Sequence, residues 1–96
     1  MIRSFRDEGT EDLFNGKSTA AARRSCPRDV LKRARVKLDR LNQAVELKDV
    51  QTPGNNLEQL HGDREGQHSV RINDKYRLCF RWAERGADDV EIVDYH

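Results

Sequence analysis

The sequence predicts an α+β domain in which two N-terminal helices pack on one face of an antiparallel β-sheet. Two patterns predict this class. Apolar residues recur at helical spacing between residues 28 and 45, and they alternate with polar residues between 70 and 82. Helical signals come first and short strands joined by turns follow, which is typical of helices covering an antiparallel meander. A chain of 96 residues has room for one such core, so we expect residues 1–96 to form a single domain.

The N-terminal quarter predicts three short segments. Apolar residues flank polar ones over residues 1–6, as in a short strand. Residues 7–14 predict a short helix, and Gly16 is its stop signal. Residues 15–26 are small and polar, so we expect a connector there.

The longest predicted element is an amphipathic helix over residues 28–45. Pro27 stands where helices favour proline, at the first turn. The residues of the apolar stripe are Val30, Leu31, Ala34, Leu38, Leu41 and Val45. Three cations, Arg33, Lys37 and Arg40, share another face of the same helix.

The C-terminal half predicts an antiparallel meander. Residues 51–66 contain glycine-rich turn chemistry and are expected to be loop. Residues 73–75 predict a hairpin turn, and residues 83–89 predict a second turn. The expected strands are residues 70–72, 76–82 and 90–93.

Composition excludes several classes of protein. Charged residues make up 36% of the chain and the net charge is +1, which argues against both a disordered chain and a uniformly basic one. No window approaches the 18 apolar residues of a membrane span, and the first six residues do not look like a secretory signal. The two cysteines, Cys26 and Cys79, lack the spacing of a zinc site or a disulfide framework. We therefore expect a reduced, cytoplasmic protein that has no membrane partner.

The small net charge conceals a basic segment. Residues 23–40 carry eight lysines and arginines and only two aspartates. Such a segment is either a solvated helix face or a surface for nucleic acid or an acidic partner.

Candidate catalytic residues gather at the C-terminus. Asp94, Tyr95 and His96 combine a carboxylate, an aromatic platform and a group that titrates near neutral pH. The alternative is a polar, frayed chain end. His61 stands before a glycine-rich loop and is a second candidate, although loop histidines are often merely exposed. His68 is a weaker third, because nothing places it relative to the others.

The strand arginines Arg71, Arg77 and Arg81 are candidates for phosphate contact, because a guanidinium matches two phosphate oxygens. Alternatively, they form cross-strand ion pairs with the acidic residues Glu84, Asp88 and Glu91.

These residue types together suit cleavage of RNA without a metal. Attack of the 2′-OH on the adjacent phosphate needs a base, an acid for the leaving oxygen and cations around the phosphorus. The three histidines lack metal-ligand spacing, and no glycine-rich phosphate loop precedes a helix. We expect no metal and no cofactor.

The sequence resembles the HigB/RelE family of toxins, the "killer protein" branch of type II toxin–antitoxin systems. The resemblance runs over nearly the whole chain and is strongest between residues 57 and 96, in the strings L-x-x-L-x-G-D-R-E-G, S-V-R-I-N-D-x-Y-R-L-C-F-x-W and the terminal V-D-Y-H. It implies a RelE-like fold and a ribosome-dependent endoribonuclease that cuts mRNA in the A-site without a metal. It also implies a helix-turn-helix antitoxin that binds the toxin and connects it to operator DNA.

The resemblance also assigns residues. Asp94, Tyr95 and His96 match the catalytic C-terminal triplet of the family, and Arg77 matches an arginine near the scissile phosphate. His61 completes the expected catalytic set. The residues expected to contact RNA or the ribosome are Arg33, Lys37, Arg40, Arg64, Arg71 and Glu58.

Two positions depart from the family pattern. His61 stands where characterised members often carry lysine, and Glu58 stands where some carry histidine. A mostly neutral imidazole and an added carboxylate should both weaken stabilisation of a phosphorane. The sequence therefore predicts a mild ribonuclease.

Two other functions remain open at this point. The ParE branch shares the fold and inhibits DNA gyrase, although the Asp94-Tyr95-His96 ending argues against it. A catalytically degenerate toxin that binds its antitoxin as a co-repressor is the other. The basic helix face is expected to bind ribosomal RNA in the nuclease, and the alternative is that it binds the antitoxin.

Overall fold

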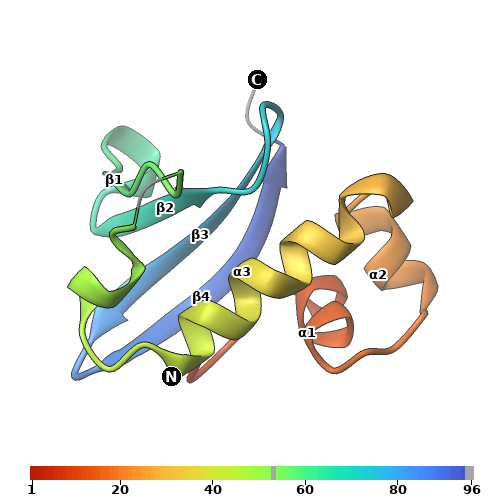
Figure 1. Cartoon of the computed structure of the whole chain (residues 1–96), viewed down its shortest axis with the longest axis horizontal. Helices are drawn as coiled ribbons and strands as arrows, with labels where there is room; N and C mark the ends of the chain where they lie inside the picture. The colour runs from red at the N-terminus through yellow and green to blue at the C-terminus, as the bar shows by residue number, and fades with distance from the viewer. Residues whose placement is uncertain (53, 95–96) are drawn as a thin grey trace.

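The computed structural model describes residues 1–52 and 54–94. A four-stranded antiparallel sheet, in the order β1-β2-β3-β4, carries helices on one side (Figure 1). The strands are β1 (Glu58–Gln59), β2 (Gln67–Arg71), β3 (Tyr76–Ala83) and β4 (Gly86–Asp94). The predicted α+β class is confirmed.

The helical layer contains three α-helices, α1 (Glu8–Phe14), α2 (Ala20–Ser25) and α3 (Leu31–Gln43). The prediction of two helices and a connector over 15–26 was therefore wrong, because α2 lies within that connector. A six-residue helix is too short to show a period, and its signals are local: the Thr19 side chain accepts a hydrogen bond from Ala22 N, and alanines favour helix.

Three 3₁₀ turns complete the helical elements, at Arg28–Val30, Leu47–Val50 and Gly62–Arg64. The predicted helix over 28–45 thus begins as a 3₁₀ turn and ends at Gln43. Its apolar stripe was predicted correctly for Ala34, Leu38 and Leu41, which are almost completely buried against the sheet, but Val45 is half exposed.

The N-terminal segment adds a fragmentary fifth strand to the sheet. Ile2 and Phe5 form isolated parallel bridges with Ala87 and Val90 of β4. Thr10 of α1 extends the pairing along the edge of β4, because its hydroxyl accepts a hydrogen bond from Ile92 N at 3.2 Å. The edge of β4 is therefore paired along much of its length, which protects it from other strands.

Both predicted turns of the meander exist, but the second is shorter than predicted. β3 ends at Ala83 and β4 already begins at Gly86. The acidic residues of this region look like loop by composition, yet they belong to β4, where Asp89 has a φ of 54° at a β-bulge. Ser4 stabilises that bulge by accepting a hydrogen bond from Asp89 N at 2.9 Å.

The register decides which side chains meet. Glu58, Ser69, Cys79 and Glu91 stand opposite one another on successive strands, so they form one row across the sheet. The alternate positions, among them Val70, Leu78 and Phe80, belong to the core beneath α3. The row with Glu58 and Ser69 therefore occupies the face that α3 does not cover.

Candidate functional site

Arg77 is the most firmly positioned of the predicted catalytic residues. Its Nε donates to Ser69 Oγ at 2.8 Å, and its Nη2 donates to the carbonyl oxygen of Asn56 at 2.7 Å. The Glu58 carboxylate lies 4.0 Å from the same Nη2. The residue is only 8% exposed, so its guanidinium has one orientation on the face of the sheet that α3 does not cover.

Arg64 occupies the other end of the same row. Its Nη1 donates to Glu91 Oε1 at 2.6 Å and to Gln67 Oε1 at 3.1 Å. Arg6 contributes a second cation 3.8 Å from the Glu91 carboxylate. Cys79 lies between these groups, and burial raises the pKa of its thiol, so it remains a protonated, unreactive thiol.

One strand arginine forms a cross-strand ion pair of the kind considered as the alternative, although with another partner, because Arg81 of β3 faces Asp89 of β4. Arg71 pairs with Asp74, Arg81 lies 3.6 Å from Asp89, and Arg77 lies near Glu58. The acidic residues expected as partners are used elsewhere, since Glu91 accepts from Arg64 and the carboxylates of Glu84 and Asp88 face Arg3. The prediction that Arg77 and Arg81 share one face agrees with the register, which puts them opposite Arg71 and Gln67.

The other predicted catalytic residues that the structure describes, His61 and Asp94, have ion-pair partners of their own. His61 is exposed, and its Nδ1 lies 3.6 Å from the Glu65 carboxylate. Asp94 stands opposite Tyr76, the residue before Arg77, so strand alternation assigns Asp94 and Arg77 to different faces of the sheet. The Asp94 carboxylate lies 3.8 Å from Lys75 Nζ. Tyr95 and His96 lie outside the described residues.

The predicted basic face of α3 borders a groove of about 400 Å³ against the β2 edge of the sheet. Arg33, Lys37 and Arg40 line it from the helix, and Arg71 lines it from the end of β2. Burial lowers the pKa of Lys37, and the neighbouring arginines 40, 33 and 71 lower it further. Within the described ranges, none of these three helix cations has a carboxylate within 4.0 Å.

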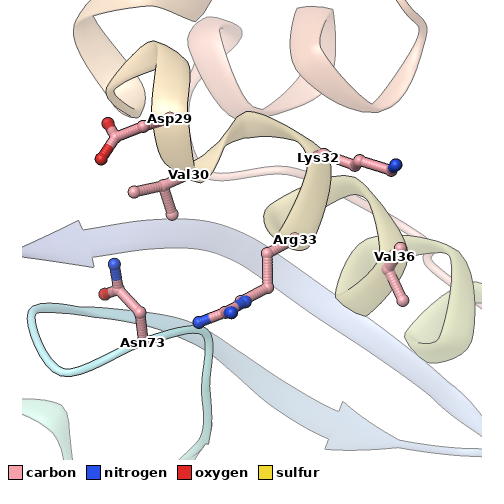
Figure 2. A pocket seen from close by; sticks show the side chains of 6 residues that line it. All are labelled: Asp29, Val30, Lys32, Arg33, Val36 and Asn73. Atoms are coloured by element: carbon pink, nitrogen blue, oxygen red, sulfur yellow. The ribbon is translucent and has the colours of Figure 1, made fainter.

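A second hollow adjoins this groove and shares Arg33 with it. Figure 2 shows Arg33 reaching from α3 toward the β2–β3 turn, where Asn73 lies across from it. Val30 and Val36 add apolar lining to this hollow, and Val36 is 42% exposed. The basic surface is therefore continuous from the turn of the hairpin to Arg40.

Asn55 joins the basic groove to the site of Arg77, and the sequence analysis missed it. Its side chain is 97% buried; Oδ1 accepts from Lys37 Nζ, and Nδ2 donates to the Val50 carbonyl at 2.8 Å. Its own carbonyl accepts from Arg71 N, and the next carbonyl, that of Asn56, accepts from Arg77. The turn-rich composition around these residues predicted only a loop, and nothing in it marks a buried amide.

The described residues contain no group of three or more metal-ligating side chains, and none of their helices is long and apolar enough to cross a membrane.

A comparison with protein families matches residues 3–96 to the model of the HigB-like toxins, which are RelE-like toxins of type II toxin–antitoxin systems. The chain belongs to the HigB-like toxin family. The resemblance inferred from the sequence is confirmed.

Two curated relatives agree with this assignment. The chain is 28% identical to "Endoribonuclease HigB" of Proteus vulgaris over 96 residues, which is the full length of both chains. It is 31% identical to "Toxin HigB-1" of Vibrio cholerae over 85 residues, covering 88% of this chain and 86% of the relative. These relatives support the expected enzyme class, an endoribonuclease.

Solved structures confirm the RelE-like fold. The YoeB–YefM toxin–antitoxin complex of Staphylococcus aureus contains a chain that superposes with a TM-score of 0.60 at 14% identity, covering 100% of this chain and 98% of that one. The YoeB dimer of the same organism gives a TM-score of 0.60 at 14% identity, covering 99% and 97%. At this identity the likeness concerns the fold alone.

Proposed function

We propose that this HigB-like toxin is a ribosome-dependent, metal-independent endoribonuclease that cleaves mRNA in the A-site and so stops translation and growth. The observation that carries the proposal is the guanidinium of Arg77, which hydrogen bonds hold on the face of the sheet that α3 does not cover. A fixed cation at a reacting phosphate stabilises charge that develops in the transition state and needs no reorganisation during the reaction.

The reaction is transfer of the scissile phosphate to the ribose 2′-oxygen. A base takes the 2′-OH proton, the oxygen attacks phosphorus, and an acid protonates the leaving 5′-oxygen. We assign these proton transfers to the C-terminal residues Asp94 and His96 together with His61, and stacking on a base to Tyr95. Arg77 neutralises the charge on the phosphorane, and the exposed side chain of His61 is accessible to RNA from solvent.

Binding to RNA and to the ribosome is assigned to two surfaces. Arg33, Lys37 and Arg40 of the α3 groove contact phosphates of ribosomal RNA, because cations without a carboxylate partner among the described residues remain available for polyanions. Arg71, which pairs with the exposed Asp74, lines the same groove and adds a fourth contact. Arg64 and Glu58 flank Arg77 on the sheet face and contact the substrate strand.

The partner that controls the toxin is a helix-turn-helix antitoxin, through which it reaches operator DNA. The solved YoeB–YefM complex, a toxin–antitoxin pair with this fold, supports such a partner. Action on the ribosome places the protein in the cytoplasm.

The decisive experiment removes His96 alone. Wild-type toxin and the variant without residue 96 are expressed in the absence of antitoxin, and 5′ ends of mRNA are mapped while growth is followed. We expect in-frame cuts and growth arrest with the wild type, and loss of both in the variant. Growth arrest without cuts in either strain overturns the nuclease. Induction of the SOS response before translation stops would then indicate a gyrase inhibitor.

One contact favours a second function, that of an antitoxin-binding co-repressor without catalysis. The Glu58 carboxylate, 4.0 Å from Arg77, opposes the charge that a nuclease needs there. Absence of cuts together with full repression of the operon by the toxin–antitoxin complex is the result expected for this function.

A further inference from the structure

A small apolar depression lies on the helical layer, between the α1–α2 connection, α2 and the beginning of α3. Its volume is about 250 Å³. Ala22, Cys26 and Leu31 supply its apolar lining, and the first two are buried. It lies at the helical end of the molecule, remote from β1 in Figure 1, and the catalytic and RNA-binding residues proposed above do not line it.

Three cations, Lys17, Arg23 and Arg28, surround this depression. All three are exposed, and within residues 1–52 and 54–94 no carboxylate lies within 4.0 Å of any of them. Arg23 donates to the Ser18 carbonyl at 3.1 Å, which holds its guanidinium at the rim. Asp29 is close enough to raise the pKa of Cys26, but it lines the hollow of Figure 2 instead.

We propose that this depression docks an acidic peptide segment of the antitoxin, with one apolar side chain in the depression and flanking carboxylates on the three cations. This inference rests on the proposed function for the existence of the antitoxin. The complementary occupant of an apolar hollow with a cationic rim is an apolar side chain with acidic neighbours.

A peptide fits this site better than RNA does. The hollow is small and most of its surface is apolar, which suits a single aliphatic group. The α3 groove differs, because three cations follow one another along the helix and Arg71 of β2 faces them, as an extended polyanion requires. The two surfaces therefore select different partners.

The test pairs two double charge reversals in the full-length toxin. Lys17→Glu with Arg28→Glu alters the rim of the depression, and Arg33→Glu with Arg40→Glu alters the α3 groove by the same net charge. The probes are the purified antitoxin encoded beside the toxin, titrated by calorimetry, and purified ribosomes in a sedimentation assay. We expect the rim variant to bind the antitoxin about tenfold or more weakly and to bind ribosomes as the wild type does. The groove variant should show the opposite pattern.

A cross-link identifies the docked segment. A photoreactive p-benzoylphenylalanine at the exposed Ser18 is irradiated in the complex, and the attached antitoxin peptide is sequenced. We expect a segment in which aspartate or glutamate flanks an apolar residue, and replacing that residue with serine should weaken binding to the same degree.

Three results would overturn this inference while leaving the nuclease intact. The first is unchanged antitoxin affinity in the rim variant, and the second is a cross-linked segment without acidic residues. The third is loss of ribosome binding in the rim variant with full antitoxin affinity, which would identify the depression as an RNA contact. If the antitoxin encoded beside the toxin does not bind the wild-type toxin at all, the antitoxin partner in the proposed function is wrong.

Discussion

The arginines of the sheet face and the cations of α3 carry the same charge but are held differently. Arg77 and Arg64 have hydrogen-bond partners fixed by the register of the strands, at 2.6–3.1 Å. Arg33 and Arg40 project from a helix face into an open groove, with no carboxylate within 4.0 Å in the described part of the chain. A held cation stabilises one geometry, whereas a mobile one contacts phosphates in many arrangements. We propose that this difference separates a reacting centre from a docking surface.

The comparison is tested most strongly at Arg77. Arg77→Lys retains the charge but loses the two hydrogen bonds that orient it, so we expect cleavage in a translating extract to fall about 100-fold or more. Arg81→Lys, on the same strand and face, is the matched control and should remain near wild type. Equal losses in both variants would argue against a special role of the two hydrogen bonds that orient Arg77.

Asn55 is the connection between the two regions. Asn55→Ala leaves Lys37 and the Val50 carbonyl without this partner, and we expect the free energy of unfolding to fall by about 1–3 kcal/mol. The Asn42 side chain accepts an exposed hydrogen bond from Ile2 N, so Asn42→Ala should lower the free energy of unfolding by less. Urea denaturation measures both, and equal costs would argue against a special role of the buried amide.

The α3 surface is tested with two arginines of one helix. Arg33→Glu should weaken ribosome binding about tenfold and reduce the salt dependence by about one unit of slope. Arg35→Glu changes the net charge identically on the side of α3 near Gly16, outside the groove, and should change little. Titrations at several salt concentrations measure both, and equal losses would indicate an effect of net charge.

The two departures from the family pattern are tested together. Glu58→His removes the carboxylate near Arg77, and His61→Lys adds a permanent cation beside the glycine-rich loop. Both changes favour a negatively charged transition state, so we expect cleavage in a translating extract to rise several-fold. An unchanged or lower rate would contradict the explanation of a mild toxin.

The smallest expected effect is that of pH on stability through His68. Burial lowers the pKa of its imidazole below the ordinary value of 6.5, and its ring lies 6.0 Å from that of Phe80. As the pH falls through 6.5, the imidazole is protonated in the unfolded chain before it is protonated in the folded one, so the folded state loses stability. The drop in urea midpoint between pH 7.5 and 5.5 should therefore be larger for wild type than for His68→Phe.

The sequence predicted the elements whose signals are periodic and long. The stripe of α3 and the alternation of β2 and β3 follow directly from burial of one face, because one core covers both. The short elements escaped prediction where composition was ambiguous. α2 has six residues, and the acidic start of β4 becomes strand only because Met1 and Ser4 accept hydrogen bonds from it.

The sequence by itself determined the fold class, the family and the basic face of α3, because each depends on residue types at local spacing. The tertiary structure alone decided which cations are held. Arg77 meets Ser69 through strand register and Asn56 through a left-handed turn, while Arg64 meets Glu91 across 27 positions of the chain. Spacing along the chain does not encode such contacts, because they depend on how strands align after the core has formed.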